Sequence, residues 1–130
     1  MIGWLEHKSE LVRDEESFTA EMEIVLDVQG FKSSLNRFVF KGVALINLED
    51  DSMPMVFYFQ SPYQWKNLLS QYKSVNRWLE KYWHGISWNS GVIPYDRLSE
   101  TLKECCKDAT KIWVKGEEKR QWVAEILTNK

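Results

Sequence analysis

The sequence predicts an α/β protein with a mixed sheet and packed helices. Three β-favouring runs separated by short turns come first, and two helical patterns, a short apolar run and a last helical pattern follow. Short turns favour antiparallel neighbours, whereas a long helical crossover places the next strand parallel to an earlier one. We therefore expect three antiparallel strands, then helices and a fourth strand parallel to the first.

The first of these strands is expected at residues 21–28. The apolar run from Ile24 to Leu26 has no polar break, which is typical of a central strand with both faces covered by protein. Asp27 is then expected at the end of this strand. Gly30 is expected to begin the turn that follows, because glycine allows the chain to reverse.

Further strands are expected at 37–48, 53–60 and 111–115, and helices at 62–84, 95–107 and 117–127. Pro54 places the third strand at an edge of the sheet. Ser61 is expected to cap the first helix and Gly85 to end it, with His84 in its last turn. Three-four spacing predicts one buried face on this helix, which includes Leu68, Tyr72, Val75 and Leu79.

Composition limits the classes of protein to consider. The chain has 130 residues, 44% of them hydrophobic, which supports one packed core. We expect an N-terminal extension at 1–20 and a single domain at 21–130. The net charge is −2, so binding of nucleic acid would need a local basic patch.

The cysteine pattern bears on the cellular setting. Cys105 and Cys106 are adjacent, so they cannot join distant parts of the fold, and no zinc-site spacing is present. An intracellular setting is expected, in cytoplasm or nucleus alike. Cys105 is expected in the core and Cys106 on the helix surface. No apolar run approaches the roughly 18 residues of a membrane span, so no membrane partner is expected.

Three segments resemble the ribonuclease H-like fold, and in particular the DEDDh exonucleases. The segment from Leu26 to Phe31 resembles the first exonuclease motif, a strand that ends in Asp-x-Glu. His84-Gly85-Ile86 is similar to the His-Gly-Ile that follows the corresponding helix in many members. The strand from Ile112 to Gly116 and the helix after it resemble the second motif. The resemblance implies a ribonuclease H-like sheet.

The sequence departs from this family at the positions that bind metal. The family holds two divalent cations with paired acids, but Gln29 stands at the second position of the first motif. Lys119 lies near the position of the next acid, and a cation there would repel a metal ion. The general-base His and the last Asp of the family lie on a later helix, which this chain, ending at Lys130, is expected to lack. The resemblance therefore implies the fold and argues against the activity.

Asp27, Glu117 and Glu118 are the candidate catalytic residues, and Asp27 is the candidate metal ligand. In a ribonuclease H-like sheet the ends of the first and fourth strands lie side by side, which would bring these acids together. As alternatives, Asp27 caps a turn, and the two glutamates favour the start of a helix. Glu23 would join Asp27 and Glu117 if the protein is a nuclease.

Four residues are candidates for binding. Trp88 lies in a polar loop and is expected to be exposed, and Trp122 lies on the last helix. Lys115 and Lys119 belong to a basic bias of the C-terminal third, which is either a nucleic-acid contact or a solvated helix face.

These features predict a catalytically inactive exonuclease-like domain that acts as a protein-interaction or nucleic-acid-associated binding module. The missing acids favour a protein that is not an enzyme and has no cofactor. A protein partner or self-association is expected, with nucleic acid as a further partner. One alternative is an active nuclease dependent on Mg²⁺ or Mn²⁺, and another is a structural subunit that a partner or second copy completes.

Overall fold

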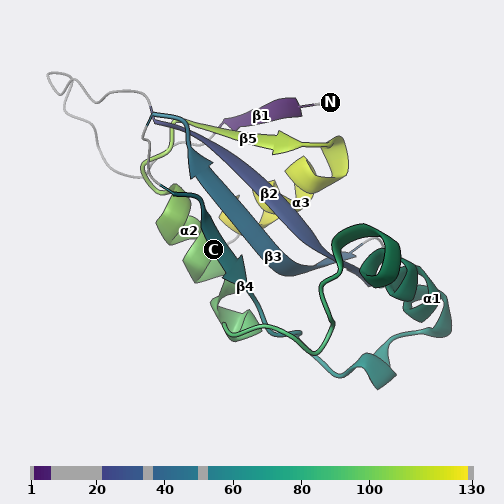
Figure 1. Cartoon of the computed structure of the whole chain (residues 1–130). Coiled ribbons are helices and arrows are strands. Elements are labelled where there is room, and N and C mark those ends of the chain that lie inside the picture. The colour runs from purple at the N-terminus through teal and green to yellow at the C-terminus, as the bar shows by residue number, and fades with distance from the viewer. Residues whose placement is uncertain (1, 7–21, 34–36, 50–52, 129–130) are drawn as a thin grey trace, which may run out of the picture. The chain divides into compact units, whose positions relative to one another are not determined.

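Figure 1 shows the protein as a computed structural model, which describes residues 2–6, 22–33, 37–49 and 53–128. The elements follow one another as β1 (Ile2–Glu6), β2 (Glu23–Ser33), β3 (Arg37–Asn47), β4 (Met55–Tyr58), η2 (Trp65–Asn67), α1 (Ser70–Leu79), η3 (Glu80–His84), η4 (Tyr95–Arg97), α2 (Leu98–Cys106), β5 (Lys111–Lys115) and α3 (Glu117–Thr128). The protein belongs to the α/β class, as predicted. None of the described helices is both long and apolar enough to cross a membrane.

The strands form a five-stranded sheet in the order β1-β5-β2-β3-β4. β5 runs parallel to β2, with Ile112 opposite Ile24, and antiparallel to β1, with Trp113 opposite Trp4. β2, β3 and β4 run antiparallel in chain order (Figure 1). The three antiparallel strands, the parallel strand after the helices and the edge position of β4 are confirmed. β1 adds a strand within the region expected as an N-terminal extension.

β2 is longer than expected, which moves two predicted residues. The strand continues through Gly30 to Ser33, so the prediction that Gly30 begins a turn is wrong. A Cβ atom at this position would overlap the carbonyl oxygen of Val39, so glycine is needed for the close approach of two backbones. Asp27 is therefore in the middle of the strand and not at its end. Asp27 is exposed, whereas Ile24 and Leu26 before it are buried.

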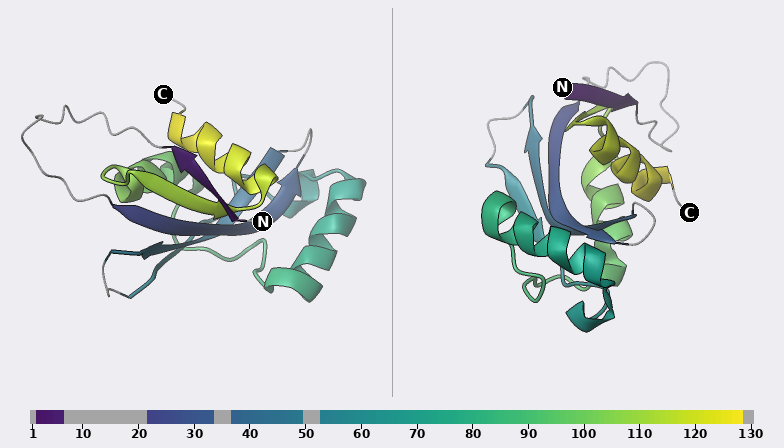
Figure 2. Two further views of the ribbon diagram at one scale, coloured as in Figure 1. Left: turned by 90° about the horizontal axis from the view of Figure 1, so that it is seen from above. Right: turned by 90° about the vertical axis from the view of Figure 1, so that its right-hand side faces the viewer.

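Contacts between residues divide the chain into two compact units. Unit 1 comprises Met1–Asp27, Leu45–Met55 and Ser99–Lys130, and unit 2 comprises Val28–Ala44 and Val56–Leu98. In unit 1, α3 packs along β1 and β5 (Figure 2). Its Val123 is fully buried, as are Ile112 and Val114 of β5.

The two cysteines have the reverse of their expected positions. Cys106 is buried, whereas Cys105 is half-buried. Burial raises the pKa of Cys106 to about 12, so its thiol stays protonated at neutral pH. Leu98 and Leu102 are buried on the same helix, α2, and the spacing of four residues from Leu102 to Cys106 explains the inward direction.

Candidate functional site

The candidate site lies in unit 2, on the helical segment formed by α1 and η3. The prediction that this helix begins at Ser61 is wrong, because α1 begins at Ser70, after Leu69. The hydroxyl of Ser61 instead donates to the carbonyl oxygen of Trp88, at 2.5 Å. At the other end, Gly85 has a φ of 69° and ends η3, as predicted.

Asn76 fixes α1 against β2. Its side chain is fully buried, its Oδ1 accepts a hydrogen bond from Lys32 N at 2.8 Å, and its Nδ2 donates to Lys32 O at 2.8 Å. One side-chain amide thus pairs with both backbone groups of a strand residue, as a neighbouring strand would. We call these two hydrogen bonds the Asn76 rung. They set the rotation of α1 about its axis.

This rotation turns part of the expected apolar face outward. Leu68 is buried, and Tyr72 and Leu79 are half-buried because they lie four before and three after Asn76. Val75 is exposed, so the prediction of its burial is wrong. The helix contacts the strand along a line through Asn76, a polar residue that hydrophobic periodicity does not reveal.

His84 holds the end of η3. Ile86 N donates to its Nδ1 at 2.9 Å, so Nε2 carries the proton and donates to Gly30 O at 2.9 Å. The ring packs edge-on against Phe31, with ring centres 5.0 Å apart. The predicted position of His84 in the last turn is confirmed. Both ring nitrogens make hydrogen bonds to the backbone.

The outward side of the helix carries exposed aromatic rings. Trp78, Tyr82 and Trp83 expose 54%, 62% and 67% of their surface. Trp78 and Tyr82 lie four residues apart, and their ring centres are 5.9 Å apart. Trp83 follows Asn76 by seven residues and would share its buried side in a regular α-helix. The wider π-helical turn of η3 accounts for its outward position.

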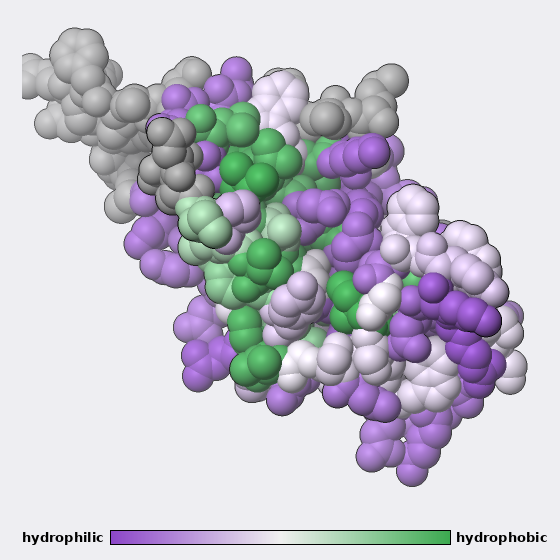
Figure 3. Space-filling model, in the orientation of Figure 1, coloured by the Kyte–Doolittle hydropathy of each residue, from purple (hydrophilic) through white to green (hydrophobic). Residues whose placement is uncertain are grey.

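A row of cations lies along the same helical segment. Lys73, Arg77 and Lys81 recur at intervals of four and therefore share one side of the helix. Lys81 Nζ lies 5.2 Å from the centre of the Tyr82 ring. Among the described residues, no carboxylate forms an ion pair with this row. In Figure 3 the residues over α1 are pale or purple rather than green.

We define the α1 face as the three cations and three exposed rings of this segment: Lys73, Arg77, Trp78, Lys81, Tyr82 and Trp83.

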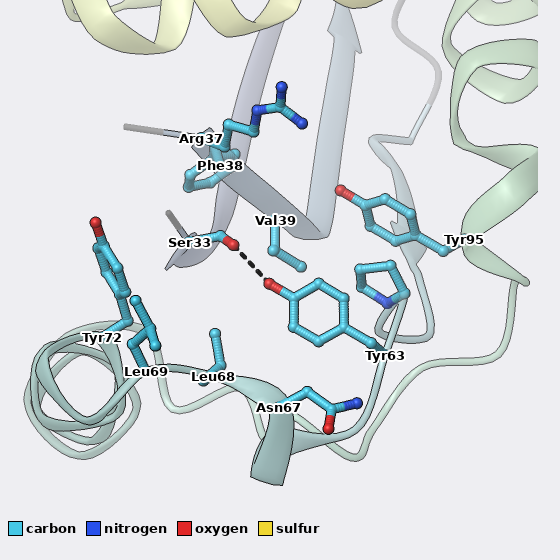
Figure 4. Close-up of a pocket in the computed structure, with 11 residues that line it drawn as sticks. Ser33, Arg37, Phe38, Val39, Tyr63, Asn67, Leu68, Leu69, Tyr72 and Tyr95 are labelled. Carbon is cyan, nitrogen blue, oxygen red and sulfur yellow. Dashed lines mark hydrogen bonds between the residues drawn. The ribbon is translucent and has the colours of Figure 1, made fainter. Parts of the chain in front are cut away.

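A groove of about 560 Å³ lies in the same unit, beside the start of α1. Tyr72 and Tyr95 stand at its opposite ends, with Tyr63 between them (Figure 4). The hydroxyl of Tyr63 lies 2.5 Å from Ser33 Oγ. Arg37 also lines the groove, and its side chain is exposed. The size falls within the range of small-molecule sites, roughly 300–1,000 Å³.

Trp88 is not exposed, so that prediction is wrong. Only 3% of its surface is accessible, and its Nε1 donates to Tyr63 O at 3.1 Å. It packs in an aromatic cluster with Phe31 and Trp65. The polar residues on either side of Trp88 remain at the surface while its indole turns inward. The polar sequence of the loop therefore does not predict that the indole is buried.

Lys41 holds this loop from within the unit. Its side chain is fully buried, and Nζ donates to Trp88 O at 3.0 Å, to Ser90 O at 2.5 Å and to Ser61 Oγ at 3.1 Å. Burial lowers the pKa of Lys41 from 10.5 to about 8. The amine therefore stays charged at neutral pH, and three N–H groups satisfy three acceptors.

The candidate catalytic acids are in unit 1. Asp27 Oδ1 lies 3.3 Å from Lys119 Nζ, and Glu117 pairs with Arg120 at 3.5 Å. Glu118 is exposed. Within the part of the chain that the structure describes, no three His, Cys, Asp or Glu side chains are grouped to hold a metal ion. Asp27 thus pairs with a cation.

The predicted basic surface of the C-terminal third contains cations that pair with acids. Besides Lys119 and Arg120, Lys107 pairs with Glu104 at 3.0 Å. Lys115 is exposed and Trp122 is half-buried. Binding by Lys115, Lys119 and Trp122 stays a prediction.

The charges of the two units differ strongly. Unit 2 contains eight Lys or Arg residues and two Asp or Glu residues, a net charge of +6. Unit 1 contains nine Lys or Arg residues and seventeen Asp or Glu residues, a net charge of −8. The overall charge of −2 therefore conceals a basic unit, and that unit carries the α1 face and the groove.

No family model, curated protein or solved structure matches the chain. The candidate site therefore rests on its own geometry. Sequence reasoning missed the row of Lys73, Arg77 and Lys81, although its four-residue spacing is visible in the chain. The sequence instead indicated a basic surface in the C-terminal third, which includes Lys115 and Lys119.

Proposed function

We propose that the protein is a binding module for single-stranded nucleic acid, which it holds on the α1 face. The observation that carries this proposal is the combination, on one helix of a unit with net charge +6, of exposed rings and cations that pair with no carboxylate among the described residues. Proteins that bind single strands combine a positive surface for the phosphates with aromatic rings on which bases stack. Trp78, Tyr82 and Trp83 supply the rings, and Lys73, Arg77 and Lys81 supply the charge.

A single strand suits this face better than a duplex. Rings can stack on bases only where the bases are unpaired. Contacts with phosphates alone would need cations and no exposed rings, whereas this face has three rings. The tilted contact between Trp78 and Tyr82 spaces two rings along the helix. Lys81 Nζ lies over the Tyr82 ring, so a phosphate that approaches this ring would meet a cation.

The proposal includes a ribonuclease H-like scaffold without nuclease activity. Adjacent, parallel β2 and β5 support this assignment, since the first and fourth strands of that fold lie side by side. The ion pair of Asp27 with Lys119 favours binding over metal-dependent cleavage, because the cation occupies the space beside the carboxylate. Cleavage of a labelled strand with Mg²⁺ or Mn²⁺ that disappears in Asp27→Ala would establish the nuclease alternative instead.

A protein partner is the second candidate. Trp, Tyr and Arg are the residues that dominate protein interfaces, and the α1 face contains all three. Salt separates the candidates, because binding to phosphates weakens steeply as salt rises, whereas an apolar interface responds little.

Fluorescence anisotropy with a labelled single strand of about 12 nucleotides tests the proposal. Affinity should fall steeply between about 50 and about 200 mM salt. Trp78→Ala and Tyr82→Ala should each weaken binding by about 1–3 kcal/mol, since each removes a stacking ring. Lys81→Ala should reduce the salt slope by about 1.

Two matched variants control for general effects. Tyr58→Ala removes an exposed aromatic ring of unit 2 that lies on β4, and Lys107→Ala removes an exposed cation of unit 1. Both should bind as the wild type does. Failure of the wild type to bind at low salt, or equal losses in the face variants and their controls, would contradict the proposal. Retention of a protein partner at high salt that is lost in Trp78→Ala would favour the second candidate.

A further inference from the structure

The groove beside α1 has a wall that suits a flat ring. Four aromatic side chains line it: Phe38, Tyr63, Tyr72 and Tyr95. Tyr63 is held in place by its contact with Ser33 (Figure 4). A planar ligand loses little conformational freedom when it stacks on these rings, so the groove favours it over a flexible chain.

Tyr95 supplies a hydrogen-bond donor within this wall. Its hydroxyl accepts a hydrogen bond from Phe40 N at 3.1 Å, which leaves its own proton for a ligand. Burial raises the pKa of Tyr95, so the hydroxyl remains protonated at neutral pH. The groove therefore offers ring surfaces together with a directed polar contact.

Arg37 supplies the charge at the rim. It is exposed, and among the described residues it has no ion-pair partner. A guanidinium group without a carboxylate partner is suited to a bidentate contact with a phosphate. Leu69 and Tyr72 connect the groove to the beginning of α1, since both line it.

We propose that this groove binds one nucleotide of the strand that the α1 face holds, with the base on the aromatic wall and the phosphate at Arg37. This inference rests on the proposed function, because it assigns the groove to the same ligand. The occupant combines a planar ring with an anion, which matches the aromatic wall and the cation of the rim. A proline-rich peptide would use the rings but would not need the guanidinium.

Titration of the ¹⁵N-labelled full chain with 5′-AMP, adenosine and a proline-rich peptide tests the groove directly. We expect AMP to shift the side-chain amide signal of Asn67 and the backbone signals of Val39 and Tyr72. Adenosine should bind about tenfold or more weakly, because it lacks the phosphate. Arg37→Ala should remove this difference, and its exposed position means that the fold remains intact.

Lys66→Ala is the matched control, since Lys66 is an exposed cation of the same unit that does not line the groove. It should bind AMP as the wild type does. The proposal is overturned if AMP leaves the groove signals unchanged, if Arg37→Ala binds AMP normally, or if only the proline-rich peptide shifts these signals.

A parallel anisotropy series separates this inference from the proposed function. Arg37→Ala should weaken binding of both the single strand and AMP. Trp78→Ala should weaken binding of the strand and leave the affinity for AMP unchanged. If the strand binds normally but AMP shifts no groove signal, only the proposal that the groove binds a nucleotide is overturned. If AMP shifts the groove signals but no strand binds, the proposed function is overturned. The claim that the groove and the α1 face share one strand is then overturned as well, and the groove is a site for a mononucleotide.

Discussion

Replacement of Asn76 by Leu tests whether the Asn76 rung holds α1 in place. Leucine has a similar branched outline but cannot form a hydrogen bond. The variant would therefore leave both the N–H and the C=O of Lys32 without the partners that they have at 2.8 Å. A buried polar group that loses its partner costs about 1–3 kcal/mol, so two such groups cost about 2–6 kcal/mol.

Two effects reduce this loss. The hydrogen bonds are only partly buried, so water can reach the groups of Lys32 in part, and the leucine side chain gains from burial. We therefore expect the free energy of unfolding to fall by about 2–4 kcal/mol. Asn76→Asp should also destabilise the protein, because its second carboxylate oxygen would face the carbonyl oxygen of Lys32.

Urea unfolding followed by far-ultraviolet circular dichroism measures the change. Asn89→Leu is the matched control, since Asn89 is exposed in the loop after η3 and the variant should stay within about 0.5 kcal/mol of the wild type. A loss below about 1 kcal/mol for Asn76→Leu would refute the view that one side-chain amide replaces a strand neighbour.

Three further predictions concern burial. Between pH 8 and 10.5 the unfolded chain binds more protons than the native protein, because burial lowers the pKa of Lys41 from 10.5 to about 8. Stability should therefore rise with pH across this window, and parallel urea midpoints for wild type and Lys41→Met would contradict this. Gly30→Ala should lower the free energy of unfolding by about 1–3 kcal/mol or more, since the new methyl group overlaps the carbonyl of Val39, and an unchanged midpoint would count against it. In thiol labelling followed by mass spectrometry, Cys105 should react before Cys106, which is buried with a pKa of about 12, and the opposite order would disprove the assignment.

The sheet could be predicted because its strands carry local signals. Ile24, Leu26 and Val28 alternate with more exposed positions, and residues 112–114 of β5 form a short apolar run. The end of β2 could not be predicted in the same way. Glycine marks turns in most sequences, but Gly30 serves the approach of β2 to β3, which depends on the position of Val39 in the next strand.

The candidate site was harder to predict because polar residues decide its orientation. Asn76 and Lys41 are buried through hydrogen bonds to backbone groups that periodicity does not register. The same reason explains the error at Trp88, which lies in a polar loop and is nevertheless enclosed. The row of cations on α1 was visible in the sequence, but its exposure depends on the Asn76 rung.

The Asn76 rung also bears on the entropy of binding. A short helix held only by apolar contacts can rock on its neighbour, and a ligand that binds such a helix must restrict this motion at a cost in free energy. Two directed hydrogen bonds to Lys32 restrict the rotation of α1 before any ligand arrives. Trp78, Tyr82 and the cations beside them are therefore preorganised. Less of the free energy of each contact with a ligand is then lost to ordering the helix, so more of it contributes to affinity.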